Sequence, residues 1–186
     1  MKLVILGGSG SGKSTQAQKL CGHFDLPLIS ISEILWNVFA NQTDQHRHPQ
    51  ICVKTTTLLP DEMMIEFIRT RLTQADVNRG WVLEGYPRSV FQAEELDFLL
   101  DDLEQKLDWA VYLQVPQAVM VSRSLGDFLP DDQPEIAQRR VELFYDRTIP
   151  VLEYYDHHRR LLTINGDQSP EMVHHHIITL VSNLRS

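Results

Sequence analysis

The sequence predicts an α/β fold with three layers, α/β/α, around a five-stranded parallel sheet. Two observations favour it. Short apolar runs without polar–apolar alternation recur along the chain, as is typical of strands buried on both faces, and longer segments of helical periodicity separate them. Strands that alternate with helices imply right-handed crossovers and a doubly wound sheet. A chain of 186 residues can bury such a core as one domain without a disulfide or a metal.

Five apolar runs are expected to form the strands of this sheet. Each is short and bounded by turn residues or by the start of a helical pattern. They lie at residues 2–6, 28–30, 81–84, 109–114 and 161–164.

Seven segments carry the helical pattern. Gly22 is expected to end the first of them, and Pro60 followed by Asp61 marks the start of the third, because acidic side chains favour a first helical turn. Residues 41–50 and 125–134 are polar or rich in Asp and Pro, which predicts loops. The helices are expected at residues 13–21, 33–40, 61–74, 90–103, 117–125, 135–155 and 170–184.

Composition excludes several classes of function. The net charge of −8 argues against a nucleic-acid-binding surface, although a polyphosphate could still bind where cations gather locally. Cys21 and Cys52 have no metal-binding or redox spacing, so reduced thiols and a cytoplasmic location are expected. No apolar run approaches the ~20 residues of a membrane span, and residues 2–6 are too short for the core of a signal peptide.

The segment GGSGSGKST, at residues 7–15, predicts a phosphate-binding loop. It fits the pattern G-x-x-x-x-G-K-[ST], with a predicted strand before it and a helix after it, as this motif requires. Its glycines bring backbone amides close to an anion, and the positive end of the first helix adds to the attraction. Lys13 is expected to reach the β- and γ-phosphates of a nucleotide, and Ser14 or Thr15 to offer a hydroxyl to Mg²⁺ or to the phosphates.

A second informative segment, GWVLEGYPRSVFQAEELD, begins at Gly80. A predicted strand ends there in Glu84, and the chain then turns through Gly85 to Arg88. Because ligands of open α/β sheets bind beyond the carboxyl ends of the strands, Glu84 is placed where it could hold Mg²⁺ through water, and Arg88 where it could face phosphates. A surface ion pair between the two is the alternative interpretation.

These motifs resemble those of the adenylate kinase family of nucleoside monophosphate kinases over nearly the whole chain. The phosphate loop continues as GGSGSGKSTQAQKL, and LEGYPRSVFQAEELD is the strongest likeness. ISISEIL, LLPDEM, VSRSLG and DDQPEIAQRRVELFYDRTIPVLEYY are similar to the borders of the family's two mobile segments. The resemblance implies one P-loop kinase domain, 1–186, with a core of residues 1–29, 60–122 and 134–186, a monophosphate-binding segment at 30–59 and a short lid at 123–133.

The resemblance also implies a set of site residues. Lys13, Arg88, Arg123 and Arg140 are the implied catalytic residues, and Ser14 and Glu84 (through water) would hold the Mg²⁺ that accompanies ATP. The implied ATP-binding residues are Gly8, Gly10, Ser11, Gly12, Lys13, Ser14, Thr15, Arg123 and Gln168. The implied monophosphate-binding residues are Ile31, Trp36, Thr57, Leu59, Gly85, Arg88, Gln92 and Arg140.

The implied activity is transfer of the γ-phosphoryl group of MgATP to a nucleoside monophosphate. AMP is the expected acceptor, because in the family the residue matching Gln92 binds adenine. Two alternatives remain open, namely a P-loop kinase for another small acceptor and a catalytically weak nucleotide-binding regulatory protein. A monomer is expected, since family members with short lids are usually monomers, and neither a nucleic acid nor a membrane is an expected partner.

Several positions depart from the family pattern. Trp36 replaces an arginine on the monophosphate, Ile31 replaces a threonine near its base, and two lid arginines are missing near residues 127–129. Ser14 replaces a usual glycine. Glu84 and Gln114 replace aspartates at the ends of strands.

Arginine clamps can contribute ~10³–10⁵ in rate, so their loss calls for substitutes. Arg140 and Arg147 are seven residues apart on a predicted helix and hence on one face, so we hypothesise that Arg147 supplies phosphate charge. Arg47, in the polar loop, is a second candidate, for the missing monophosphate arginine.

Overall fold

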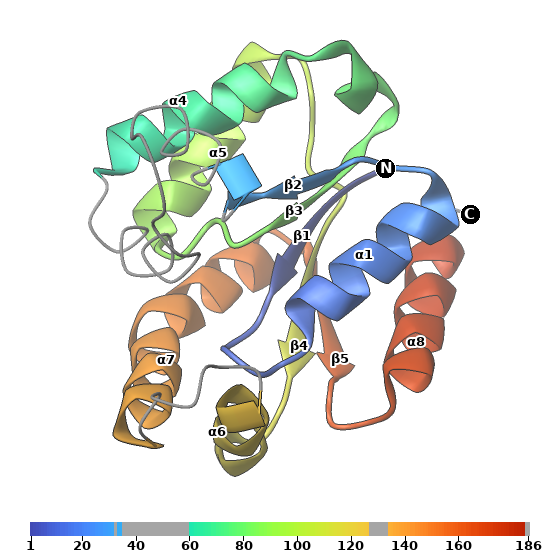
Figure 1. Cartoon of the computed structure of the whole chain (residues 1–186). Helices are drawn as coiled ribbons and strands as arrows, with labels where there is room; N and C mark the ends of the chain where they lie inside the picture. Colours follow the sequence, from blue (N-terminus) through green and yellow to red (C-terminus); the bar gives the residue numbers. More distant parts are fainter. Residues whose placement is uncertain (32, 35–59, 127–133, 185–186) are drawn as a thin grey trace, which may run out of the picture.

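The computed structural model describes residues 1–31, 33–34, 60–126 and 134–184. Its centre is a five-stranded, all-parallel sheet with the strand order β2-β3-β1-β4-β5, so the predicted fold class is confirmed (Figure 1). The strands are β1 (Lys2–Leu6), β2 (Leu28–Ser30), β3 (Trp81–Glu84), β4 (Trp109–Gln114) and β5 (Leu161–Asn165).

Helices cover both faces of this sheet (Figure 1). On one face, three helices contribute side chains to a buried core that also contains Val4 of β1. These side chains include Ile68, Leu96 and Tyr155. The helices described are α1 (Lys13–Phe24), α4 (Asp61–Leu72), α5 (Val90–Asp102), α6 (Gln117–Gly126), α7 (Pro134–His157) and α8 (Pro170–Asn183), with a 3₁₀ turn, η1, at Ala75–Arg79.

The other face is covered by α1 and α8. Leu20 of α1 and Ile177 of α8 are fully buried against Ile5 of β1. Successive side chains of β1 thus enter opposite cores, which is why the strand reads as one apolar run. Among the described residues, no helix is long and apolar enough to cross a membrane.

The sequence placed the end of the first helix incorrectly. Helix α1 passes through Gly22 and ends at Phe24, and Asp25 takes the left-handed conformation at its C-cap, where its N–H donates to the carbonyl of Cys21. Phe24 packs against the core beneath α1 and α8, and this contact holds the extra residues in the helix. The turn η1 was not predicted.

Candidate functional site

The phosphate loop connects β1 to α1 at the carboxyl edge of the sheet (Figure 1). Gly12 is the N-cap of α1 and has a left-handed backbone with φ 88°, which glycine adopts without strain. No acidic side chain occupies the first turn of α1, so the positive end of the helix is free to attract an anion. Ser11 is buried, and its Oγ has no hydrogen-bond partner within the described residues. This loop therefore has the properties of an anion site.

Lys13 lies at the first position of α1 and turns back over the loop. Its Nζ donates a hydrogen bond to the carbonyl oxygen of Gly8 over 2.7 Å. Burial lowers the pKa of Lys13 to about 8, an effect that Glu84 opposes and the positive charge of Arg88 adds to. Arg88 is thus close enough to Lys13 to influence its pKa electrostatically.

Helix α6 packs against the phosphate loop. Ser124 of α6 is buried and donates a hydrogen bond to Ser9 Oγ over 3.0 Å. Gly10 has φ 76°, and a Cβ there would collide with the backbone carbonyl of Met120, so α6 packs directly on the loop. No sequence pattern indicates Ser124, because its partner is 115 residues away.

An oxygen-rich group surrounds Glu84 at the end of β3. Ser14 Oγ donates to Glu84 Oε1 over 3.2 Å, and Ser30 Oγ donates to Glu84 Oε2 over 3.5 Å. Hydroxyl and carboxylate oxygens of this kind suit Mg²⁺, directly or through its water shell. The structure thus brings the two predicted metal residues, Ser14 and Glu84, together. Ser30 is an addition that the sequence did not indicate.

The turn after β3 carries the second group of predicted residues. Arg88 Nε donates to the carbonyl of Gly85 over 2.7 Å, and its side chain is exposed. Desolvation by surrounding protein nevertheless lowers the pKa of Arg88, with Glu84 acting in the opposite direction. Ile31 is buried beside Gly85, where a Cβ would lie 3.4 Å from Ile31 Cβ.

Gln92 lies in the first turn of α5 and is held by both ends of its amide. Its Oε1 accepts from the backbone N–H of Arg88 over 2.7 Å, and its Nε2 donates to Asp61 Oδ1 over 2.6 Å. Ser89 caps the helix by accepting from the Gln92 backbone N–H. The sequence pattern indicates Asp61 only as the start of a helix.

Arg123 joins α6 to the loop after β5. Its guanidinium donates to the carbonyl of Gly166 over 3.1 Å and to Asp167 Oδ1 over 3.0 Å. Gln168 follows in the same loop, and its Oε1 is buried with no hydrogen-bond partner in the described part of the chain. Arg123 and Gln168, both predicted ATP-binding residues, therefore border one region.

Other predicted residues can be placed only in part. Thr15 is exposed in the first turn of α1. Most of the proposed monophosphate segment and most of the lid lie outside the described residues. These undescribed parts include Trp36, Arg47, Thr57 and Leu59. Arg140 and Arg147 both belong to α7, so their positions share a helix face, and the side chain of Arg147 is exposed.

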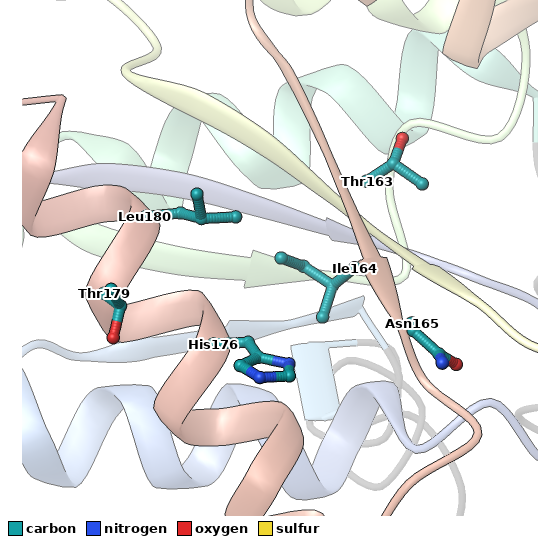
Figure 2. Close-up of a pocket in the computed structure, with 6 residues that line it drawn as sticks. All are labelled: Thr163, Ile164, Asn165, His176, Thr179 and Leu180. Atoms are coloured by element: carbon teal, nitrogen blue, oxygen red, sulfur yellow. The ribbon is translucent and has the colours of Figure 1, made fainter.

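A shallow pocket of about 260 Å³ lies elsewhere, between β5 and α8. Figure 2 shows Ile164 from the strand and Leu180 from the helix on its walls, with His176 nearby. No residue of the phosphate loop lines this pocket, so we do not assign it to the nucleotide site.

Comparison with known proteins agrees with this geometry. A family model described as adenylate kinase matches residues 5–160. The chain is 67% identical to adenylate kinase 2 of Nostoc sp. over 97% of this chain and 98% of that protein. It is 53% identical to adenylate kinase 2 of Synechocystis sp., covering 89% of this chain and 92% of that protein. Adenylate kinase 1 of Nostoc sp. is 40% identical over 95% of this chain and 96% of its own length.

Proposed function

Because the chain belongs to the adenylate kinase family, we infer that it catalyses the reversible transfer of the γ-phosphoryl group of ATP to AMP, giving two molecules of ADP. The observation that carries this conclusion is the 67% identity to an adenylate kinase over nearly the full length of both chains. A kinase for a non-nucleotide acceptor and a regulatory nucleotide-binding protein are both less well supported, since neither would account for this similarity.

We propose that ATP occupies the side of the site formed by the phosphate loop and α6. The amides of Gly8, Gly10, Ser11 and Gly12 and the hydroxyls of Ser14 and Thr15 would surround its phosphates. Lys13 would leave the carbonyl of Gly8 and reach the transferring group. Arg123 and the loop around Gln168 would contact the adenine, which is supported by the hydrogen bond between Arg123 and Gly166.

We propose that AMP occupies the opposite side. Arg88 would bind phosphate at the reaction centre, and its electrostatic effect on Lys13 supports this placement. Gln92 would read the adenine, with Ile31 and Gly85 beside it. Residues 30–59 and 123–133 are the proposed monophosphate-binding segment and lid, in which Trp36, Thr57 and Leu59 would complete the acceptor site.

Ser14 and Glu84 would hold Mg²⁺ that arrives with ATP. Their oxygen donors fit this ion and contain no nitrogen or sulfur ligand. The ion would neutralise charge on the β- and γ-phosphates.

The protein contributes alignment and positive charge to the reaction. In a loose transition state, negative charge spreads over the transferring oxygens, and cations already in place stabilise it without reorganisation. Lys13, Arg88, Arg123 and Arg140 are proposed for this role, with Arg147 as a substitute for missing family arginines. Closure of the two segments would exclude water, which would otherwise hydrolyse ATP. We further propose that the enzyme is a monomer, as its resemblance to short-lid members of the family implies. We also propose a cytoplasmic location, because its two cysteines have no metal-binding or redox spacing.

A coupled assay with MgATP tests the function. The purified chain is offered AMP, CMP, UMP and GMP, together with gluconate and shikimate as non-nucleotide acceptors. AMP turnover of roughly 10 per second or more is expected. Turnover of a non-nucleotide alone, or ATP binding without turnover of any acceptor, would contradict the proposal.

A further inference from the structure

We propose that Asp61 is a positioning residue that fixes the amide of Gln92 in the orientation that reads adenine, and that it thereby sets the preference for AMP over 6-oxopurine monophosphates. The proposal rests on the function proposed above, in which Gln92 contacts the base of the acceptor. It goes further by explaining what makes that contact selective.

The amide of Gln92 is held from two directions. Gln92 Oε1 accepts from the Arg88 backbone N–H over 2.7 Å, and Gln92 Nε2 donates to Asp61 Oδ1 over 2.6 Å. The backbone of Gln92 is fixed as well, because its N–H donates to Ser89 Oγ at the N-cap of α5. The side chain therefore has little freedom before any base arrives.

These two partners allow only one orientation of the amide. An ionised carboxylate such as Asp61 only accepts hydrogen bonds, whereas the backbone N–H of Arg88 only donates. A half-turn of the amide would set Gln92 Oε1 against the carboxylate and Gln92 Nε2 against the N–H, so both contacts would become repulsive. The assignment of oxygen and nitrogen at Gln92 thus follows from the chemistry of its partners.

The fixed amide keeps one N–H and one lone pair for a ligand, since each partner uses only one. Adenine offers a complementary edge, with an amino group that donates and a ring nitrogen that accepts. Hypoxanthine and guanine present the reverse pattern, a carbonyl oxygen beside a ring N–H. An amide that could turn would bind either edge, so Asp61, together with the backbone N–H of Arg88, provides specificity by disfavouring the second arrangement.

The substitution Asp61→Asn keeps the hydrogen bond to Gln92 Nε2 but removes the carboxylate repulsion that opposes the turned amide. Asparagine has nearly the same shape and can still accept from Gln92 Nε2, but it can also donate to Gln92 Oε1 after the amide turns. In this variant only the backbone N–H of Arg88 still opposes the turned amide. We expect the ratio of kcat/KM for AMP to kcat/KM for IMP to fall at least tenfold, with most of the change in the two KM values. IMP is the probe because it differs from AMP only at the edge that Gln92 reads.

Two further variants control for loss of charge and of fold. Glu62→Gln removes a charge from the same first turn of α4, where Glu62 is exposed, and should leave the AMP:IMP ratio within twofold of the wild type. Asp61→Glu retains an acceptor-only group and should preserve the ratio even if both KM values rise. Thermal unfolding of each variant shows whether it is folded.

The outcomes separate this proposal from the function on which it rests. A wild-type enzyme that does not phosphorylate AMP overturns the proposed function. A wild-type enzyme that does so, with an AMP:IMP ratio unchanged by Asp61→Asn, overturns the role of Asp61 alone. An equal fall in the ratio for Glu62→Gln or Asp61→Glu would overturn it as well.

Discussion

Lys13 Nζ donates a hydrogen bond to the carbonyl oxygen of Gly8, so the loop proposed to hold phosphates holds its own lysine in the structure. Burial, with a further contribution from Arg88, lowers the pKa of Lys13 to about 8. A bound polyphosphate should raise this pKa again, because the charged form gains a partner. Lys13 should therefore take up a proton when ATP binds at pH 8 but not at pH 6.5, where it is already protonated.

Calorimetric titration of ATP in buffers of different ionisation enthalpy measures this proton uptake. At pH 8 the wild type should take up about half a proton more than Lys13→Met, since a group with a pKa near 8 is half protonated there. The comparison with Lys13→Met cancels the ionisation of ATP itself. Equal uptake by both proteins would contradict the lowered pKa.

Gly10→Ala should disrupt the phosphate loop. Gly10 has φ 76°, and a Cβ there meets the carbonyl of Met120, which is backbone and cannot move aside cheaply. We expect the KM for ATP to rise at least tenfold in steady-state assays.

Gly22→Ala is the matched control for Gly10→Ala. Gly22 lies in α1, and a Cβ there meets nothing within 4 Å. This variant should leave the kinetics unchanged and stabilise the protein by ~0.5–1 kcal/mol, because alanine is the better helix former. A Gly10→Ala enzyme with wild-type KM would show that the loop tolerates displacement from α6.

Ser124→Ala should weaken ATP binding through the loop. Ser124 is buried and its hydroxyl bonds Ser9 over 3.0 Å, so the variant frees the tip of the loop. We expect the KM for ATP to rise severalfold. A double-mutant cycle with Ser9→Ala should give a coupling energy of ~0.5–1.5 kcal/mol, whereas Ser122→Ala, exposed on the same helix, should have no effect. Additive effects of the two serine substitutions would contradict the link.

Arg147→Ala tests the proposed substitute for the missing arginines. If Arg147 provides phosphate charge beside Arg140, kcat should fall at least tenfold. Arg139→Ala is the control, because Arg139 lies on the same helix but pairs with Glu142 over 3.7 Å. Arg47→Ala examines the second candidate. Unchanged kcat/KM for both Arg147→Ala and Arg47→Ala would contradict the proposal that these residues replace the missing family arginines.

Asp97→Ala should destabilise the fold and spare catalysis. Asp97 of α5 accepts from the Tyr154 hydroxyl over 2.8 Å and from Arg160 over 3.0 Å, which ties α5 to α7 and to the start of β5. Leaving two partly buried donors unpaired should cost about 1–3 kcal/mol in urea unfolding. Asp101→Ala, exposed one turn later on α5, should change stability by less than about 0.5 kcal/mol. A loss of kcat with unchanged stability would contradict this purely structural role.

The strands and the phosphate loop could be predicted because their signals are local. Residues 2–6 form a buried strand whichever neighbours it pairs with, and a glycine-lysine motif between a strand and a helix has few other uses. The error at Gly22 has the same origin, because the local rule for glycine took no account of the packing of Phe24.

Contacts between distant segments could not be predicted in this way. Ser124 bonds Ser9 across 115 residues, and Gln92 bonds Asp61 across 31. No periodicity or spacing in the sequence records which helix will lie beneath the loop or beside the turn. Resemblance to a family supplied the proposed roles of Arg123 and Gln92, but not the residues that hold them in place.

The position of β1 in the middle of the sheet also bears on how the chain folds during synthesis. Leu3 is flanked by Val82 on one side and by Trp109 on the other, so neither neighbour of the first strand exists when that strand leaves the ribosome. Strand β3 is complete only at Glu84 and β4 only at Gln114, so the four buried apolar side chains of β1 lack one of their two neighbouring strands until more than half of the polypeptide has been translated. Nascent chains stalled before β4 should accordingly engage holding chaperones, and release from them should coincide with the emergence of that strand.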